Sequence, residues 1–305
     1  MEFTGERYMP GVGDQIAYEH LHRYALACEY VSGRTVLDIA SGEGYGSRLL
    51  AKSAKKVVGV DLSEEAISHA KAKYANQENL DFLVGSCTNI PAADGFFDVV
   101  VSFETIEHIT EHDKMLDEIK RVLKPGGILI ISSPNKKTYT DDVQSKNVYH
   151  VHELYLSEFK NLLNARFKNV FLMGQRLTFS SHIWPEEENT KTMGFEHYSG
   201  DDEKFSGSVP APYEALYFIA ICADAGGMST HSSLFTQTND SLFNFYSKLP
   251  GQLEEKAQQL AEKERQLAEK DRQLAEKNQR IEELLTSLSW KVTAPLRKLY
   301  GILKK

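Results

Sequence analysis

Apolar and polar residues alternate along the first part of the chain in a pattern that predicts strands and helices in turn. Short β-branched runs that read as strands lie at 35–39, 56–60, 80–84, 97–102, 128–132, 170–177 and 215–222. Segments with helical spacing of apolar residues lie between or before them at 14–31, 47–52, 66–74 and 113–123. We expect 159–166 to finish the sheet together with 170–177 and 215–222. This alternation is typical of an α/β fold whose parallel sheet is covered on both faces.

A different pattern occupies residues 251–288. The apolar residues that recur every seven positions are Leu253, Leu260, Leu267, Leu274, Ile281 and Leu288. The other core position of the heptad is only partly apolar, because it is polar at Glu264, Asp271 and Asn278 and apolar only at Ala257 and Leu285. The pattern favours a self-associating coiled coil over a lone solvated helix with pairs such as Glu276/Arg280. It leaves the number of chains open.

These patterns divide the chain into four parts. We expect a catalytic domain at 1–225, a linker at 226–250, the coiled coil at 251–288 and a tail at 289–305. The alternation breaks within the first part at 178–213, which we interpret as an insertion that acts as a lid on the acceptor side. A disordered loop is the alternative for that stretch.

Charge and cysteine content limit the classes of partner and compartment. A net charge of −8 argues against a general nucleic-acid binder. Cys28, Cys87 and Cys222 lie far apart without metal-binding spacing, as expected for reduced thiols in a cytoplasmic protein. We find neither a signal-peptide core at the N-terminus nor a run of about 18 apolar residues.

The tail at 289–305 is basic and amphipathic. Its cations, Lys291, Arg297, Lys298, Lys304 and Lys305, occur with no acidic residue among them. Apolar residues alternate with these cations, and two of them are Trp290 and Tyr300. This composition suits an anionic membrane surface, and a helix that docks on a partner protein is the alternative. We therefore expect a peripheral protein on the inner face of the cytoplasmic membrane.

The most informative stretch is a glycine turn that follows the strand at 35–39. Gly42, Gly44 and Gly46 lie between that strand and the next helix, an arrangement that lets backbone approach a nucleotide-like ligand. Glu43 lies inside the turn, where its charge would repel a phosphate, so a cationic ligand fits better. Asp61 ends the following strand, where a carboxylate can accept hydrogen bonds from both hydroxyls of a ribose.

Three further motifs follow in a fixed order. They are Gly95-Phe96-Phe97-Asp98-Val99-Val100-Val101-Ser102, Phe103-Glu104-Thr105-Ile106-Glu107-His108-Ile109 and Arg121-Val122-Leu123-Lys124-Pro125-Gly126-Gly127-Ile128-Leu129. Together with the glycine turn they resemble the class I methyltransferases that depend on S-adenosylmethionine, of the type 11-like kind. The resemblance implies a Rossmann-like sheet of seven strands with the last strand antiparallel, and S-adenosylmethionine as the cofactor.

The resemblance also implies which residues hold the cofactor. It assigns close backbone approach to the three glycines, an orienting role to Asp38, and the ribose to Asp61 with Leu62 beside it. Ser86 stands where the family often has an acidic residue near adenine, with Cys87 next to it, and Phe103 and Glu104 flank the cofactor. Ala40 replaces a usual glycine. Arg23, in a segment that resembles the cap of related sugar methyltransferases, pairs with the methionine carboxylate or makes a surface salt bridge.

Histidines are the candidates for the base that takes a proton from the acceptor. His108 follows the fourth strand, and related sugar O-methyltransferases have histidine near its position. His150 and His152 follow the fifth strand. Because two histidines without a clear third ligand are weak evidence for a metal, we expect a metal-free site.

The tail after the coiled coil resembles segments of bacterial surface-polysaccharide enzymes, including glycosyltransferases. We therefore expect transfer of a methyl group to a sugar hydroxyl in an O-antigen-type polysaccharide, with a glycosyltransferase as a partner. The alternatives are methylation of a quinone or other small lipid, and a non-catalytic scaffold in which the helix recruits a glycan-assembly enzyme.

Overall fold

A computed structural model describes residues 15–144, 146–178, 198–200, 205–207, 214–225, 233, 235 and 241–303. The chain divides into two compact units, Met1–Asn239 and Asp240–Lys305. The N-terminal cap segment at 4–10 and most of 226–240 lie outside the described residues.

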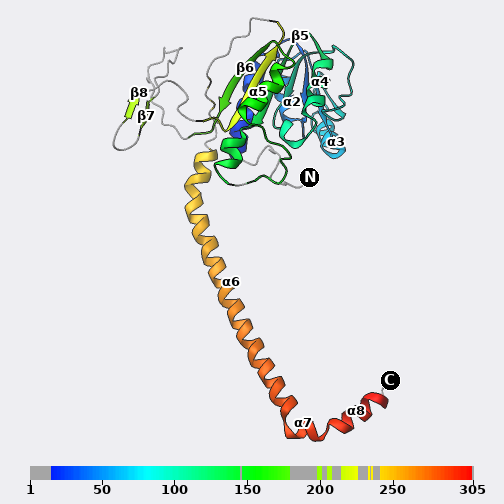
Figure 1. The fold of residues 1–305 in the computed structure, drawn as a ribbon, viewed down its shortest axis with the longest axis vertical. Helices are drawn as coiled ribbons and strands as arrows, with labels where there is room; N and C mark the ends of the chain where they lie inside the picture. Colours follow the sequence, from blue (N-terminus) through cyan, green and yellow to red (C-terminus); the bar gives the residue numbers. More distant parts are fainter. Residues whose placement is uncertain are drawn as a thin grey trace. The chain divides into compact units, whose positions relative to one another are not determined.

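A seven-stranded sheet with the order β3-β2-β1-β4-β5-β9-β6 forms the centre of the first unit (Figure 1). Its strands are β1 Thr35–Ile39, β2 Lys56–Asp61, β3 Leu80–Val84, β4 Phe97–Ser102, β5 Leu123–Pro134, β6 Asn169–Gln175 and β9 Tyr217–Ala223. Strands β1 to β5 pair in parallel, and β9 pairs antiparallel with both β5 and β6. The expected α/β fold and the antiparallel last strand are confirmed.

Helices cover both faces of this sheet. They are α1 Gln15–Cys28, α2 Tyr45–Leu50, α3 Glu64–Lys73, α4 His112–Val122 and α5 Leu156–Asn164, with short turns of helix at η1 Ile106–His108 and η2 Lys137–Asp141. Ser63 begins α3 by accepting a hydrogen bond from the Ala66 N–H at 3.2 Å. The expectation that 159–166 would help finish the sheet is wrong: most of this stretch lies in α5, where Phe159 and Leu163, four residues apart, are buried on one helical face. The other predicted elements occur in the predicted order, and β5 begins earlier than predicted because Leu123 already pairs with Phe97 across a bulge.

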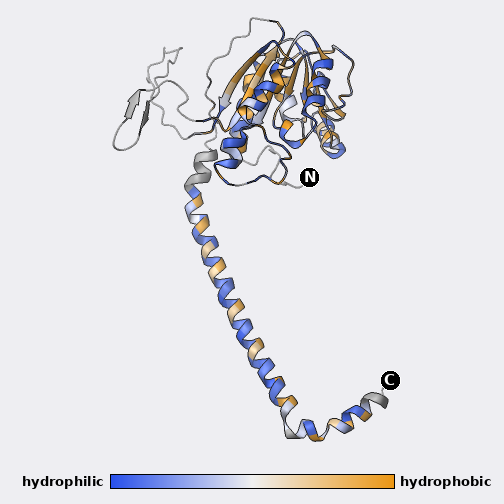
Figure 2. Cartoon of the chain, viewed as in Figure 1, coloured by the Kyte–Doolittle hydropathy of each residue, from blue (hydrophilic) through white to orange (hydrophobic). Residues whose placement is uncertain are grey.

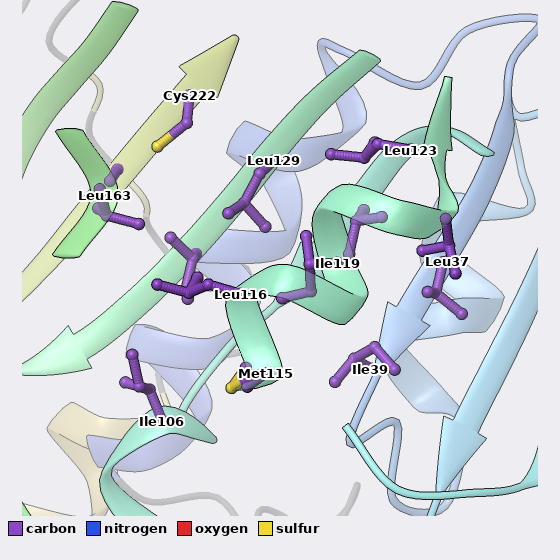
Figure 3. Packing of buried hydrophobic residues seen from close by; sticks show 14 of the residues in the cluster. Leu37, Ile39, Ile106, Met115, Leu116, Ile119, Leu123, Leu129, Leu163 and Cys222 are labelled. Carbon is purple, nitrogen blue, oxygen red and sulfur yellow. The ribbon is translucent and has the colours of Figure 1, made fainter. Parts of the chain in front are cut away.

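Alternate residues of the central strands enter two separate cores. Leu37 of β1 packs with Leu116 and Ile119 of α4 on one face, and Figure 3 shows these side chains between the helix and the strands. Val36, the neighbour of Leu37, enters the other core with Leu50 of α2. Because both faces are covered, the central strands are mostly apolar, and the sheet gives a rigid edge at the carboxyl ends of its strands.

Within 178–213, two short strands pair antiparallel. They are β7 Tyr198–Gly200 and β8 Phe205–Gly207. The remainder of the predicted lid, apart from Thr178, lies outside the described residues. Its function as a lid stays a prediction.

The second unit consists of helices α6 Ser241–Thr286, α7 Leu288–Val292 and α8 Ala294–Leu303. Helix α6 begins before the predicted coiled coil and contains Pro250, so the last part of the stretch that we predicted as linker is helical. Apolar residues recur along α6 among hydrophilic ones (Figure 2). Arg272 pairs with Glu276 at 3.3 Å and Arg280 with Glu283 at 3.0 Å, instead of the expected Glu276/Arg280 pair. No described helix combines the length and apolarity that crossing a bilayer requires.

Candidate functional site

A cavity of about 520 Å³ lies at the carboxyl ends of the parallel strands. This is the edge where open α/β sheets bind their ligands. The cavity volume falls within the range of about 300–1,000 Å³ that is usual for small-molecule sites. The residues that line it after strands β1 to β4 include Ala40, Ser41, Gly42, Glu43, Asp61, Leu62, Ser86, Cys87, Phe103 and Glu104.

The Asp61 carboxylate is held in place by backbone groups. It accepts hydrogen bonds from the Gly42 N–H at 2.8 Å and from the Ser63 N–H at 2.9 Å. A carboxylate has about four acceptor positions, so these bonds leave capacity for both hydroxyls of a ribose. The geometry therefore suits the role that the sequence assigned to Asp61.

The three glycines of the turn serve different purposes. Gly42 has a positive φ of 53°, and a Cβ there would meet nothing within 4 Å, so its backbone lies open to the cavity. A Cβ on Gly44 would lie 2.4 Å from the Phe82 ring, and one on Gly46 would lie 1.9 Å from the Tyr24 ring. Close packing inside the domain explains Gly44 and Gly46, and neither lines the cavity.

Asp38 supports the glycine turn from beneath. Its carboxylate is fully buried and accepts hydrogen bonds from Ser47 Oγ at 2.6 Å and Tyr24 Oη at 3.1 Å. Burial raises the pKa of Asp38 to about 7, although these two hydrogen bonds oppose the shift. Because Asp38 joins β1 to α2 through Ser47, it positions the turn, and it is not among the residues that line the cavity.

Arg23 lies in the interior of the domain. The side chain is fully buried, so the alternative prediction that Arg23 makes a surface salt bridge is wrong. Its Nη1 lies 2.8 Å from Glu104 Oε1, its Nε–H donates to Gln175 Oε1 at 2.8 Å, and the guanidinium stacks on Tyr217. Arg23 therefore orients Glu104. Glu104 lines the cavity, and its backbone has a positive φ of 48°.

Leu62, Ser86 and Cys87 are neutral residues of the cavity lining. The Leu62 side chain is 75% exposed and offers an apolar surface beside Asp61. The Ser86 hydroxyl interacts with Thr88 Oγ1 at 2.9 Å, and burial raises the pKa of the Cys87 thiol. A neutral lining of this kind suits the flat face of a base.

Two of the three candidate histidines lie together in the cavity lining, and we call this part of the cavity its polar or histidine end. The rings of His108 and His150 lie 5.1 Å apart between centroids, and both residues line the cavity with Tyr139. His150 Nδ1 lies 2.6 Å from Glu153 Oε1, which fixes the ring. His152 instead packs beside His112 and does not line the cavity.

The charges of the cavity suit a cationic ligand. Its acidic residues are Glu19, Glu43, Asp61, Glu104 and Glu107, and no lysine or arginine is among its described lining residues. A sulfonium and an ammonium group are attracted by such a surface, whereas a pyrophosphate is repelled. The residues therefore fit S-adenosylmethionine, with Asp61 for its ribose and Gly42 as open backbone.

Comparison with known proteins agrees with this geometry. Residues 37–131 match the family model described as a methyltransferase domain. These residues are similar to a methyltransferase domain. Together with the sheet topology, the match indicates the class I fold with S-adenosylmethionine as its cofactor.

Curated relatives of this domain come from several bacteria. The chain is 34% identical over 168 residues to a probable S-adenosylmethionine-dependent methyltransferase of Mycolicibacterium smegmatis, covering 54% of this chain and 64% of the relative. It is 32% identical over 178 residues to one of Mycobacterium tuberculosis, covering 57% and 64%. It is 37% identical over 101 residues to a demethylmenaquinone methyltransferase of Clavibacter sepedonicus, covering 33% and 41%. The chain thus spans less than two thirds of these relatives' length.

Several residues at the histidine end of the cavity were not assigned from the sequence. They are Glu107, Tyr139, Asn147 and Tyr149, with Glu153 behind His150. Glu107 directly precedes His108 in the motif at 103–109, so its position beside a candidate base could have pointed to it from the sequence. The others lie on the chain after β5, and their approach to His108 depends on how that segment folds back.

Proposed function

We propose that this protein transfers a methyl group from S-adenosylmethionine to a hydroxyl of a sugar. The observation that carries the proposal is the polar end of the cavity, where His108, His150 and Tyr139 lie together. Imidazole and phenol groups can exchange hydrogen bonds with the hydroxyls of a carbohydrate, and an aromatic ring can pack on a sugar face. A polysaccharide of the O-antigen type is the acceptor that we expect.

The residues of the chain have separate tasks in this reaction. When bound, S-adenosylmethionine supplies the methyl group from its sulfonium and leaves as neutral S-adenosylhomocysteine. Asp61 and Gly42 orient the cofactor end, and alignment of the reacting atoms can contribute about 7–11 kcal/mol to the barrier reduction. An imidazole nitrogen at the polar end accepts the proton that the sugar hydroxyl loses, and Glu153 stabilises the charge when His150 is that acceptor.

A labelled-methyl assay tests the proposal directly. The full chain is incubated with methyl-labelled S-adenosylmethionine and a panel of glycans, and the label is expected on a sugar oxygen. Asp61→Ala is expected to weaken cofactor binding by at least about tenfold, because hydrogen bonds to a charged group contribute about 1.5–3 kcal/mol each. Asp81→Ala is the matched control, since Asp81 pairs with Lys56 on the surface of the neighbouring strand. An unchanged dissociation constant in Asp61→Ala would refute the ribose role.

A second candidate is methylation of a quinone or other small lipid. Relatives named demethylmenaquinone methyltransferase support it, and one of them matches over 184 residues at 27% identity. The same assay includes demethylquinones, and label on a quinone with none on any glycan would favour this candidate.

For the second unit we propose self-association of α6 and attachment of the tail to an anionic membrane surface. Leu296, Leu299 and Tyr300 recur at helical spacing in α8 and are 62–70% exposed. Arg297 stacks on the Trp290 ring, so a cation and an amphipathic ring lie side by side. Each lysine or arginine near an anionic surface contributes about 1 kcal/mol. A glycosyltransferase is the partner that would bring the polysaccharide to this surface.

Vesicle sedimentation tests the attachment. The full chain is expected to sediment with vesicles that contain phosphatidylglycerol and to stay in solution with neutral ones. Removal of 289–305 is expected to abolish sedimentation. Equal sedimentation with and without the tail would contradict the assignment.

A further inference from the structure

Three potential metal ligands converge at the polar end of the cavity. Glu107, His108 and His150 each offer one ligand atom, and these atoms lie within 4.8 Å of one another. Glu107 is fully buried, and neither of its carboxylate oxygens has a hydrogen-bond partner in the part of the chain that the structure describes. A buried carboxylate that lacks donors is costly unless a proton or a cation accompanies it.

The anchoring of the two histidines sets the direction of their lone pairs. His108 Nδ1 lies 3.0 Å from the Tyr149 carbonyl oxygen, and His150 Nδ1 lies 2.6 Å from Glu153 Oε1. Both partners accept hydrogen bonds, so each Nδ1 carries the hydrogen and each Nε2 presents a lone pair. This carboxylate or carbonyl contact behind the ring is the arrangement that orients metal-binding histidines. The Asn147 amide lies 3.0 Å from His150 Nε2, and a bound cation would replace that contact.

The backbone ties the two histidine-bearing segments together. The Glu107 carbonyl oxygen accepts hydrogen bonds from the Val151 N–H at 2.8 Å and from the His152 N–H at 3.0 Å. The loop after β5 is thereby held against η1, which carries Glu107 and His108. The cluster is therefore built by the fold and does not depend on mobile side chains alone.

The surrounding charges leave Glu107 without a matched cation. Arg23 lies 2.8 Å from Glu104, whereas the nearest basic group in a described ion pair with Glu107 is His108 Nε2 at 3.9 Å. A divalent cation would relieve this unfavourable state.

We propose that Glu107, His108 and His150 bind a divalent metal ion. Two imidazoles and one carboxylate suit Mn²⁺, Fe²⁺ or Zn²⁺. Metal–ligand bonds of about 2.0–2.2 Å span up to about 4.4 Å between opposite ligands, so small side-chain rotations close the cluster on one ion. From the sequence we expected no metal because His150 and His152 had no clear third ligand. The proposed site instead combines His150 with His108 and Glu107.

The site gives the proposed function a second way to activate its acceptor. Three protein ligands leave coordination positions open toward the cavity, where the acceptor hydroxyl would bind. A metal ion acidifies a hydroxyl that coordinates it. The hydroxyl proton would then pass to solvent water, and the histidines would hold the ion instead of accepting that proton themselves. This role rests on the proposed function, whereas the metal site itself does not.

Titration of the full chain with Mn²⁺, followed by electron paramagnetic resonance, tests the site. We expect one bound ion per chain. Glu107→Gln and His108→Asn are each expected to weaken binding by at least about tenfold, since loss of even an outer-shell partner typically costs about 10–100-fold. His152→Asn is the matched control, because His152 follows His150 by two residues and packs beside His112 outside the cluster. It is expected to bind Mn²⁺ like the unaltered chain.

The outcomes separate the site from the function. Absence of binding would overturn the metal site and indicate a protonated Glu107. Equal affinity in all variants would also overturn it and indicate that Mn²⁺ binds elsewhere on the surface. If Glu107→Gln does not fold by circular dichroism, His108→Asn decides, because its side chain is 28% exposed. Binding of Mn²⁺ without methylation of any glycan would overturn the proposed function and leave the site intact. Methylation that persists in excess chelator, with no Mn²⁺ bound, would overturn the metal site and support the proposed function.

Discussion

The two units of the chain treat their apolar residues in opposite ways. In the first unit Leu116 and Phe97 are fully buried between helix and sheet. In the second unit Leu260 and Leu267 are 60% and 61% exposed, and no described side chain is buried. The first unit therefore finds its packing partners within its own sequence, whereas the leucine row of α6 needs a partner from elsewhere to be covered.

The largest expected effect comes from the same substitution made in both units. Leu116→Ala is expected to lower the free energy of unfolding of the first unit by about 3–5 kcal/mol, because it removes buried methyl groups and leaves a cavity. Leu267→Ala is expected to leave that value unchanged. Urea denaturation followed by the fluorescence of the first unit measures both. A loss above about 1 kcal/mol in Leu267→Ala would show that the units are not independent.

Buried ionisable groups give the second difference between the units. Asp38 has a pKa raised from 3.8 to about 7, so the folded state binds its proton more tightly than the unfolded state does. The stability from this proton is fully present below about pH 4 and is lost as the pH rises through about 7. This difference in pKa between the unfolded and folded states corresponds to up to about 4 kcal/mol in the free energy of unfolding.

Asp38→Asn tests this pH dependence. Unfolding of the first unit, measured by denaturant at several pH values, is expected to lose the downward slope between pH 4 and 7 in the variant. The helicity of the second unit is expected to show no such slope, since its described side chains are not buried. A slope that persists in Asp38→Asn would assign the effect to other groups.

Self-association is the third test of the comparison. If α6 covers its leucines with a second copy, Leu267→Gln is expected to weaken association by about 2 kcal/mol per chain through loss of buried apolar area. Arg265→Gln, on the outer side of the heptad, is the control and is expected to associate normally. Sedimentation equilibrium of the full chain measures both. A monomer at all concentrations would favour the lone solvated helix.

The sequence predicted the sheet well because strand runs and helical spacing act over short distances. The runs at 80–84 and 97–102 became β3 and β4 with the predicted ends. The cofactor end of the site was also within reach, since Gly42 and Asp61 lie at the ends of neighbouring strands. The spacing of the glycines did not reveal that Gly44 and Gly46 face Phe82 and Tyr24, because that packing depends on distant side chains.

The polar end of the site was harder to foresee for the same reason. His108 and His150 lie far apart in sequence, and they meet because the Glu107 carbonyl binds the loop after β5. No local pattern encodes such a bond. Burial of Arg23 was missed because its partners, Glu104 and Gln175, come from two other elements.

Backbone strain supplies the smallest and sharpest contrast. Gly42 has a positive φ of 53°, a conformation in which an alanine costs about 1–2 kcal/mol. Gly251 lies in the exposed helix α6 with nothing within 4 Å of a Cβ, where alanine is favoured over glycine by about 0.5–1 kcal/mol. Gly42→Ala is therefore expected to destabilise the first unit, and Gly251→Ala is expected to increase the helicity of the second.

Ala40→Gly completes the test, because Ala40 already has a left-handed φ of 57° at the edge of the cavity. Relief of that strain exceeds the entropic cost of glycine by about 0.5 kcal/mol, so thermal unfolding of the first unit is expected to shift upward. Far-UV circular dichroism measures all three variants. If Ala40→Gly destabilises the first unit instead, the Cβ of Ala40 makes packing contacts that outweigh the backbone strain. The left-handed conformation of Ala40 would then not be an example of strain stored at a binding site.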